Sequence, residues 1–314
     1  MMKGLELAEL FYHEYGKNMI AEKFPEYENR IAVGVVGEGS DCFGYDDEVS
    51  RDHDFEAGFC LWIPDELEHE LEFKLSRAYA KLPEEFCGVA RAKQSLWGRN
   101  RRGVMLAGEF YSRFTGRPGA PQSLSEWLHT PEYSLACAVN GRVFRDDLGE
   151  FSSVRKTLAA GYPEDVRLKK IAARAALMAQ SGQYNYERCL KHGEAGAARM
   201  ALHEFVQNGL SMVFLLNHRY MPYYKWAFRA ARELPEYSEL AEELEALLAA
   251  DPRKSDRTRN PIRERIEAVS AGVIAALRAE ELTDGPWDYL EPHAYEVMER
   301  IRDGNLRNIH VMEG

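Results

Sequence analysis

The residues of this chain whose types and spacing best suit catalysis are a Gly-Ser pair, Gly39 and Ser40, and two later carboxylates, Asp52 and Asp54. In a strand, residues two apart project from one face, so the carboxylates would aim at a common point. Two such carboxylates either repel each other or share a cation, and Mg²⁺ prefers oxygen ligands of this kind. The glycine lets backbone approach a phosphate closely, and the serine adds a hydroxyl donor. The pattern predicts a site for magnesium and a phosphate chain.

A purely structural interpretation of the same residues stays open. Gly39-Ser40 is then an ordinary turn at a strand end, and Asp52-His53-Asp54 is an ordinary exposed edge. A lone Gly-Ser pair would favour that interpretation. The Gly-Ser pair and the acid-x-acid segment each lie next to an apolar run, and together they favour the interpretation as a site for magnesium and phosphate.

Gly39-Ser40, the loop and Asp52-His53-Asp54 resemble the signature of the polymerase-β-type nucleotidyltransferase superfamily. That signature is a Gly-Ser turn followed by an acid-x-acid strand. Over most of its length the chain also resembles an uncharacterised bacterial branch, whose loop reads much like residues 39–47 (GSDCFGYDD). The resemblance implies transfer of a nucleoside monophosphate, AMP from ATP, to an acceptor. It also implies one or two Mg²⁺ ions held by Asp52 and Asp54.

Active members of this superfamily usually carry a third carboxylate on a later strand. The matching apolar stretch, residues 104–107, has none, and Glu109 follows it directly. Glu109 is therefore a candidate catalytic residue. Its other interpretation is an acid in the first turn of a helix, where the helix dipole favours it. If Glu109 does not serve, the base comes from the second half of the chain or transfer itself is in doubt.

The second half offers candidates of its own. Glu204 lies on a polar stripe of a predicted helix and could activate an acceptor as a general base. Aromatic residues are dense beside cationic ones over 217–226, where Lys225 occupies a place comparable to the lysine that kanamycin-type enzymes direct at a triphosphate. Arg188 could reach a phosphate. The alternatives are a solvated helix face, an aromatic belt that packs the bundle, and a simple role at a helix start.

Hydrophobic patterning places these residues on two kinds of structure. The first half interleaves strands, expected at 31–36, 54–63, 104–107 and 142–146, with helices such as 65–82. After about residue 155 only helical periodicity is found. We expect an α+β fold: a nucleotidyltransferase-type mixed sheet with helices over residues 1–158, then an all-α helical bundle over residues 159–314. The active site would lie in a cleft between the two domains.

Composition narrows the possible partners. The formal charge of −11 on 314 residues argues against binding of bulk nucleic acid, and no segment suits a membrane span. Five scattered cysteines and the absence of a signal-peptide core indicate reduced thiols and a cytoplasmic protein. The expected partners are an NTP and an acceptor, which could be a small molecule, a protein or an RNA end. Two alternatives stay open: a nucleotide-binding regulatory protein without turnover, and an antitoxin-like protein that adds AMP to a partner.

Overall fold

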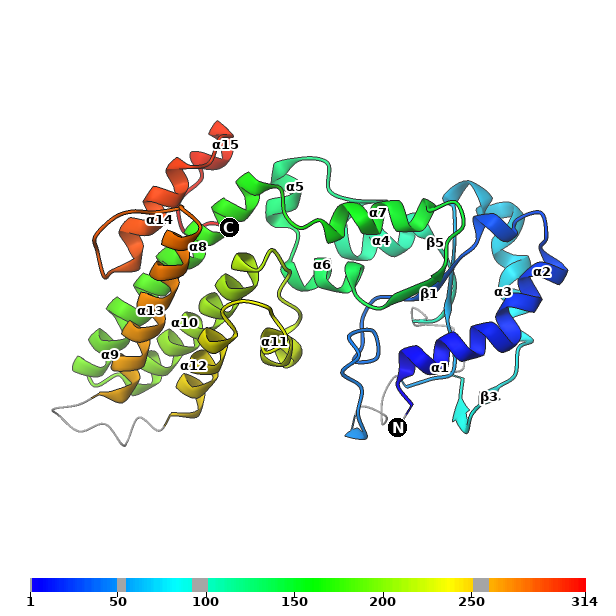
Figure 1. Cartoon of the computed structure of the whole chain (residues 1–314), viewed down its shortest axis with the longest axis horizontal. Helices are drawn as coiled ribbons and strands as arrows, with labels where there is room; N and C mark the ends of the chain where they lie inside the picture. Colours follow the sequence, from blue (N-terminus) through cyan, green and yellow to red (C-terminus); the bar gives the residue numbers. More distant parts are fainter. Residues whose placement is uncertain (1, 50–54, 92–100, 251–259) are drawn as a thin grey trace. The chain divides into compact units, whose positions relative to one another are not determined.

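The structure is a computed structural model that describes residues 2–49, 55–91, 101–250 and 260–314 (Figure 1). Its contacts divide the chain into two compact units. Unit 1 comprises Met1–Pro121 and Ser134–Ala160, and unit 2 comprises Gln122–Tyr133 and Gly161–Gly314. Among the described residues, no helix combines the length and apolarity that a membrane span requires.

Unit 1 is built around a mixed sheet of four strands in the order β5-β2-β1-β6. Strand β1 runs antiparallel to β2 and β6, whereas β5 runs parallel to β2. The last residue of β1 therefore lies at the edge where β2 and β5 begin, which we call the exit edge. The strands span β1 (Ala32–Val35), β2 (Cys60–Ile63), β5 (Gly103–Leu106) and β6 (Arg142–Arg145).

The two faces of this sheet carry different cores because alternate strand residues point to opposite sides. On one face, Leu61 and Ile63 join a buried apolar cluster with residues of α1 and α3. On the other face, the Trp62 ring stacks on Phe151 at 4.0 Å between centroids. Figure 1 shows α1, α2 and α3 on one side of the sheet and α4 and α7 on the other. The unit 1 helices are α1 (Gly4–Phe11), α2 (Lys17–Lys23), α3 (Phe73–Ala80), α4 (Ala107–Thr115), most of α6 (Glu132–Val139) and α7 (Glu150–Ala159), and a small hairpin adds β3 (Glu85–Phe86) and β4 (Val89–Ala90).

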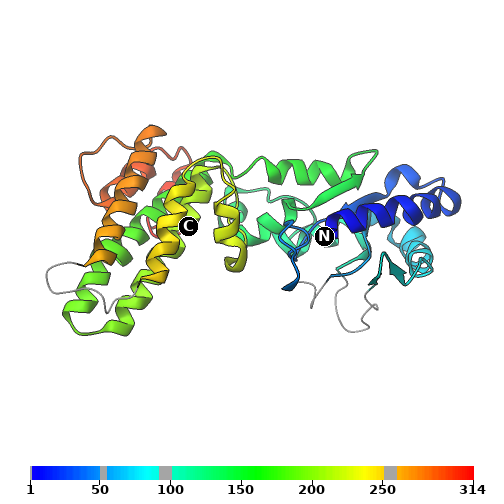
Figure 2. The ribbon, with the colours of Figure 1, turned by 60° about the horizontal axis from the view of Figure 1, so that its bottom comes forward.

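Unit 2 consists of helices and connecting loops throughout its described residues. Helix α8 is its centre, since α10 and α14 both pack against it, and α12 packs on α10 (Figures 1 and 2). Almost every residue of α8 is buried, including three cationic ones. The elements are α5 (Leu124–His129), α8 (Glu164–Met178), α9 (Glu187–Lys191), α10 (Ala195–Leu216), α11 (Tyr224–Ala231), α12 (Ser238–Ala249), α13 (Pro261–Ala279), α14 (Leu290–Glu299) and α15 (Gly304–Arg307).

The α+β fold class expected from the sequence is confirmed, with differences in two elements of unit 1. The strand expected at 54–63 is limited to β2, because residues 55–59 are not in a strand. The backbone amides of Ala57 and Phe59 instead bind the Ala90 carbonyl and the Tyr79 hydroxyl, at 3.2 and 3.1 Å. The helix expected at 65–82 begins with 3₁₀ and π turns, and only Phe73–Ala80 is α-helical.

Gly34 in β1 provides a stringent test of this sheet. A β-carbon there would lie 2.8 Å from the Val143 α-carbon of β6 and would overlap the neighbouring Arg142 carbonyl. We expect Gly34→Ala to lower the free energy of unfolding by about 3 kcal/mol, because the strands must separate. Gly116→Ala is the control. It has a positive φ of 76° but no atom within 4 Å of the new β-carbon, and should cost about 1 kcal/mol. Equal losses in urea titrations would contradict the close approach.

Candidate functional site

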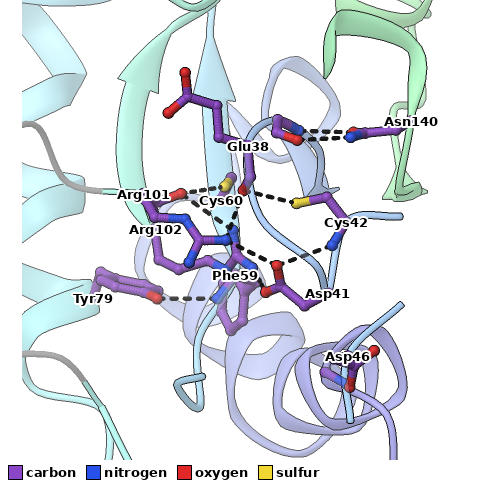
Figure 3. A network of polar contacts seen from close by, with 12 residues as sticks. Glu38, Asp41, Cys42, Asp46, Phe59, Cys60, Tyr79, Arg101, Arg102 and Asn140 are labelled. Carbon is purple, nitrogen blue, oxygen red and sulfur yellow. Dashed lines mark hydrogen bonds and ion pairs between the residues drawn. The ribbon is translucent and has the colours of Figure 1, made fainter. Parts of the chain in front are cut away.

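The candidate site is the turn that leaves β1 at the exit edge and contains Gly39 and Ser40. Gly37 and Gly39 have φ angles of 125° and 117°, which residues with a side chain rarely adopt. The Asn140 side chain fixes the first glycine: its Oδ1 accepts from the Gly37 amide at 2.9 Å, and its Nδ2 donates to the Gly37 carbonyl at 2.7 Å (Figure 3). The turn is thus tied to the segment that enters β6.

After the turn, the loop closes on itself through backbone hydrogen bonds. The Tyr45 amide donates to the Ser40 carbonyl at 2.8 Å, and the Gly44 amide donates to the Asp41 carbonyl at 3.0 Å. Gly39 and Ser40 stay half-buried, while Glu38 is exposed. A compact loop therefore presents the Gly-Ser pair at the surface of unit 1.

A buried carboxylate, Asp41, holds this loop to the start of β5. Its Oδ1 accepts from Arg101 Nη2 at 2.8 Å and from the Cys42 amide at 2.9 Å. Its Oδ2 accepts from Arg102, whose side chain is only 4% exposed (Figure 3). We call Asp41, Arg101 and Arg102 the Asp41 lock.

The electrostatics of the lock keep Arg102 charged. Burial by itself lowers the pKa of Arg102, but the negative charge of Asp41 opposes this, and the pKa stays above its ordinary value. Burial also raises the pKa of the Cys42 thiol to about 12, so this thiol is neutral near pH 7. Asp41 is therefore the buried carboxylate that pairs with the Arg102 charge.

Gly39 is required by the lock as well as by its backbone angle. A β-carbon at Gly39 would overlap Arg101 Nη2 and would lie 2.6 Å from the Asp41 carboxylate. Arg101 Nη2 also donates to the Glu38 carbonyl at 2.6 Å. In this structure the group that lies closest to the Gly39 backbone is therefore an arginine of the same chain.

A second buried acid, Asp46, fastens the end of the loop to α1. Its Oδ2 accepts from the Gly4 amide at 2.9 Å, at the first residue of the helix. Lys3 contributes an ion pair to Asp46 Oδ1 at 3.8 Å. A negative charge is favourable at a helix N-terminus. The loop is therefore held at both ends.

The other residues predicted for this site are not placed beside it. Asp52 and Asp54 lie outside the described residues. Glu109 is exposed in the first turn of α4, just after β5 ends at Leu106. Because the turn with Gly39 lies at the exit edge, where β5 begins, Glu109 is at the opposite end of the sheet. The structure therefore does not bring Glu109 to Gly39 and Ser40.

At that opposite end of the sheet, unit 1 contains a cavity of about 270 Å³. Trp62, Asp65, Gly108 and Tyr111 are among the residues that line it. Gly39 and Ser40 do not line it, so the cavity does not mark the predicted phosphate site.

In unit 2, Glu204, Arg188 and Lys225 are all exposed, and no described contact joins them. Arg188 Nη1 donates to the Tyr184 hydroxyl at 3.1 Å. The Lys225 ammonium lies 5.0 Å from the Trp226 ring centroid. The predicted polar stripe of α10 does contain a buried polar residue, Ser211.

Sequence reasoning missed the charged residues that the structure buries. In unit 1 these are Asp41, Asp46 and Arg102. The available signals were an acid directly after Gly-Ser and an Arg-Arg pair before a strand. In unit 2 the buried charged residues are Glu132, Arg167, Lys169 and Lys170. The signal there was a Lys-Lys pair inside a helix that is otherwise largely apolar.

The arrangement in unit 1 can bind anionic groups. The turn offers backbone amides and a serine hydroxyl, and the partly exposed Arg101 adds a guanidinium group, which suits phosphate oxygens. Among the described residues, no group of three or more His, Cys, Asp or Glu side chains could hold a metal ion.

The comparisons with known proteins add limited information. A family model described as "Domain of unknown function (DUF4037)" matches residues 127–227. No curated protein matches the chain. A solved structure of a nucleotidyltransferase-like protein from Exiguobacterium sibiricum is similar at 12% identity and a TM-score of 0.38, covering 92% of this chain and 81% of that one.

Neutralising the carboxylate of the lock tests its contribution to stability. Asp41→Asn leaves the Arg102 charge buried without a counterion, so we expect a loss of about 3–5 kcal/mol in the free energy of unfolding. The control is Glu9→Gln, which removes an exposed pair with Arg142 and should cost less than about 1 kcal/mol. Adding Arg102→Met to Asp41→Asn should recover part of the loss. Urea denaturation that gives similar losses for both single variants would refute the lock.

Thiol reactivity provides an independent test of the same loop. With a pKa of about 12, Cys42 should have a thiolate fraction on the order of 10⁻⁴ at pH 8. We expect iodoacetamide to modify the exposed Cys87 in the native protein and to reach Cys42 only in urea. Peptide mass spectrometry would measure both sites. Equal native labelling of the two thiols would show that the loop is open.

Proposed function

We propose that the chain is a Mg²⁺-dependent nucleotidyltransferase that transfers AMP from ATP to an acceptor. The observation that carries this proposal is the Gly39-Ser40 turn, held at the exit edge by buried ion pairs and followed along the chain by Asp52 and Asp54. The turn would bind the phosphates, and the two carboxylates would bind the metal.

The rigidity of the turn supports this role. Phosphoryl and nucleotidyl transfer depend mainly on positioning and on groups that stabilise charge as it develops. A turn fixed by Asn140 on one side and by Asp41 on the other needs little reorganisation when a phosphate binds. The Arg101 side chain, 21% exposed, adds positive charge at the same edge.

The donor chemistry for magnesium comes from Asp52 and Asp54, whose carboxylate oxygens suit a hard cation. The described residues offer no alternative cluster of three or more ligands. When bound, magnesium would neutralise charge on the phosphates and on the leaving pyrophosphate.

The remaining roles are assigned to exposed residues of unit 2. Glu204 is proposed as the base that activates the acceptor, with Arg188 and Lys225 as phosphate ligands. The position of Glu109 at the far end of the sheet does not support its role as the third carboxylate. The acceptor is a small molecule, a protein side chain or an RNA end, and the five free cysteines fit a cytoplasmic setting.

One observation favours a second function, nucleotide binding without turnover. Strand β5 carries no carboxylate, and the two residues just before it are Arg101 and Arg102. The third carboxylate that an active transferase would carry on this strand is missing, and two arginines lie just before the strand at the exit edge. A protein of this kind would bind NTP and regulate a partner.

Incubation with Mg²⁺ and each NTP separates these functions. For a transferase we expect release of pyrophosphate with a suitable acceptor, together with a rise in Tm. The double variant Asp52→Asn with Asp54→Asn should lose both responses, because the metal loses its ligands. Asp47→Asn, a change of the same kind in the same loop, should retain both.

The outcomes are distinct. A rise in Tm without pyrophosphate release across a panel of acceptors would favour the binding protein. Unchanged NTP affinity in the double variant would remove the metal site, and with it both functions as proposed here.

A further inference from the structure

Unit 2 contains a buried polar cluster that the proposed function does not use. Its members are Glu132 at the start of α6, Tyr162 just before α8, Lys170 and Arg174 on α8, and Ser211 on α10. We call this set the α8 cluster. Lys170 and Arg174 are four residues apart and so lie on one face of the helix.

Three members of the cluster satisfy one another. The Ser211 hydroxyl lies 2.8 and 3.1 Å from the two carboxylate oxygens of Glu132. Arg174 donates from Nε to Ser211 at 3.0 Å and pairs with Glu132 at 3.5 Å. Arg174 Nη2 also donates to the Gly314 carbonyl at 3.0 Å. The Glu132 carboxylate is therefore already engaged.

The other two members have donors that no described contact uses. Lys170 is 4% exposed, and its ammonium has no hydrogen-bond acceptor among the described contacts of the chain. It lies 5.2 Å from the centroid of the Tyr162 ring. The Tyr162 hydroxyl is buried and has no hydrogen-bond partner in the described structure. Burying the Tyr162 hydroxyl in this way costs free energy unless an acceptor pairs with it.

The other buried cations of α8, Lys169 and Arg167, have hydrogen-bond or ion-pair partners within the protein. Lys169 Nζ donates to the carbonyls of His310 and Val311 at 2.8 and 3.2 Å. Arg167 pairs with Glu164 and Glu280, at 2.8 Å each. Each of these cations has acceptors within the protein. Lys170 differs from both because it has none among the described residues.

We propose that the α8 cluster binds an oxyanion, a phosphoryl or carboxylate group of a small ligand, with Lys170 and Tyr162 as donors. The oxygens of Glu132 and Gly314 bond to Arg174 and Ser211, and no described hydrogen bond joins them to Lys170. The Lys170 ammonium and the Tyr162 hydroxyl both lack a hydrogen-bond acceptor among the described residues, and an oxyanion would supply several acceptor oxygens. The Arg174 side chain, 15% exposed, gives a small anion access from solvent.

The electrostatics of Lys170 agree with this geometry. Burial lowers the pKa of Lys170, Glu132 raises it and Arg174 lowers it, and together these effects bring it to about 8. An anion beside the ammonium would restore the charged form. This proposal does not depend on the Gly39-Ser40 turn or on magnesium.

The test measures anion binding to the full chain without nucleotide or magnesium. Inorganic phosphate and acetate are titrated separately by calorimetry at constant ionic strength, with chloride as the reference ion. Lys170→Met removes the ammonium, and Lys191→Met makes the same change at an exposed lysine paired with Glu187. We expect Lys170→Met to weaken binding at least about tenfold, and Lys191→Met to leave it unchanged.

Tyr162→Phe removes only the hydroxyl, and we expect it to weaken binding by about tenfold. If Lys170→Met fails to fold by circular dichroism, Tyr162→Phe carries the comparison with Lys191→Met. Binding of phosphate but not acetate would assign a phosphoryl ligand, and the reverse would assign a carboxylate. Binding of neither ion to the wild-type chain, or equal binding by all variants, would overturn the proposal whatever the outcome for nucleotide transfer.

Discussion

The buried ion pair between Asp41 and Arg102 is the interaction on which the candidate site in unit 1 depends. An arginine that is 4% exposed would be very costly without a counterion, and Asp41 is the carboxylate bonded to it. The same carboxylate binds Arg101 and the Cys42 amide, so three donors converge on one acid. The conformation of the Gly39-Ser40 turn follows from this convergence. The shape of the turn and the stability of the unit therefore depend on the same atoms.

The two units handle buried charge in different ways. In unit 1 the buried guanidinium of Arg102 is matched by a carboxylate from a loop 61 residues earlier in the chain. In unit 2, the buried Lys169 of α8 bonds to carbonyls after α15, and the buried Arg167 pairs with Glu164 of α8 and with Glu280, which follows α13. Lys170 is the exception among the described cations of that helix. Because Lys170 lacks, among the described residues, the hydrogen-bond acceptors that the other cations of α8 have, a binding role for it is worth testing.

The fold class could be predicted from the sequence because it rests on local patterns. The apolar runs that became β1 and β5, and the helical periodicity after residue 155, act over a few residues at a time. The strand expected at 54–63 was too long, because the Phe59 amide bonds to the side chain of the distant Tyr79 rather than to the backbone of a strand. Local patterns do not contain that information.

The candidate site could be predicted only in part for the same reason. The Gly-Ser pair was found from its residue types, and its place after β1 agrees with the expected turn. The partners of Asp41 could not be found, because arginines in a polar stretch are normally exposed. Glu109 was proposed from its position after β5, but the direction of the strands decides which end of the sheet it occupies. Strand direction depends on pairing between distant segments.

The partners of the turn also determine when it can form. Asn140, which binds Gly37, lies 103 residues further along the chain, and Arg101 lies 63 residues after Glu38. During synthesis the Gly39-Ser40 segment leaves the ribosome long before these residues exist. Contacts of such long sequence separation close late in folding, because the loops between them must first be ordered. The turn is thus completed only after the chain has reached β6, so an unfinished or partly unfolded chain lacks it.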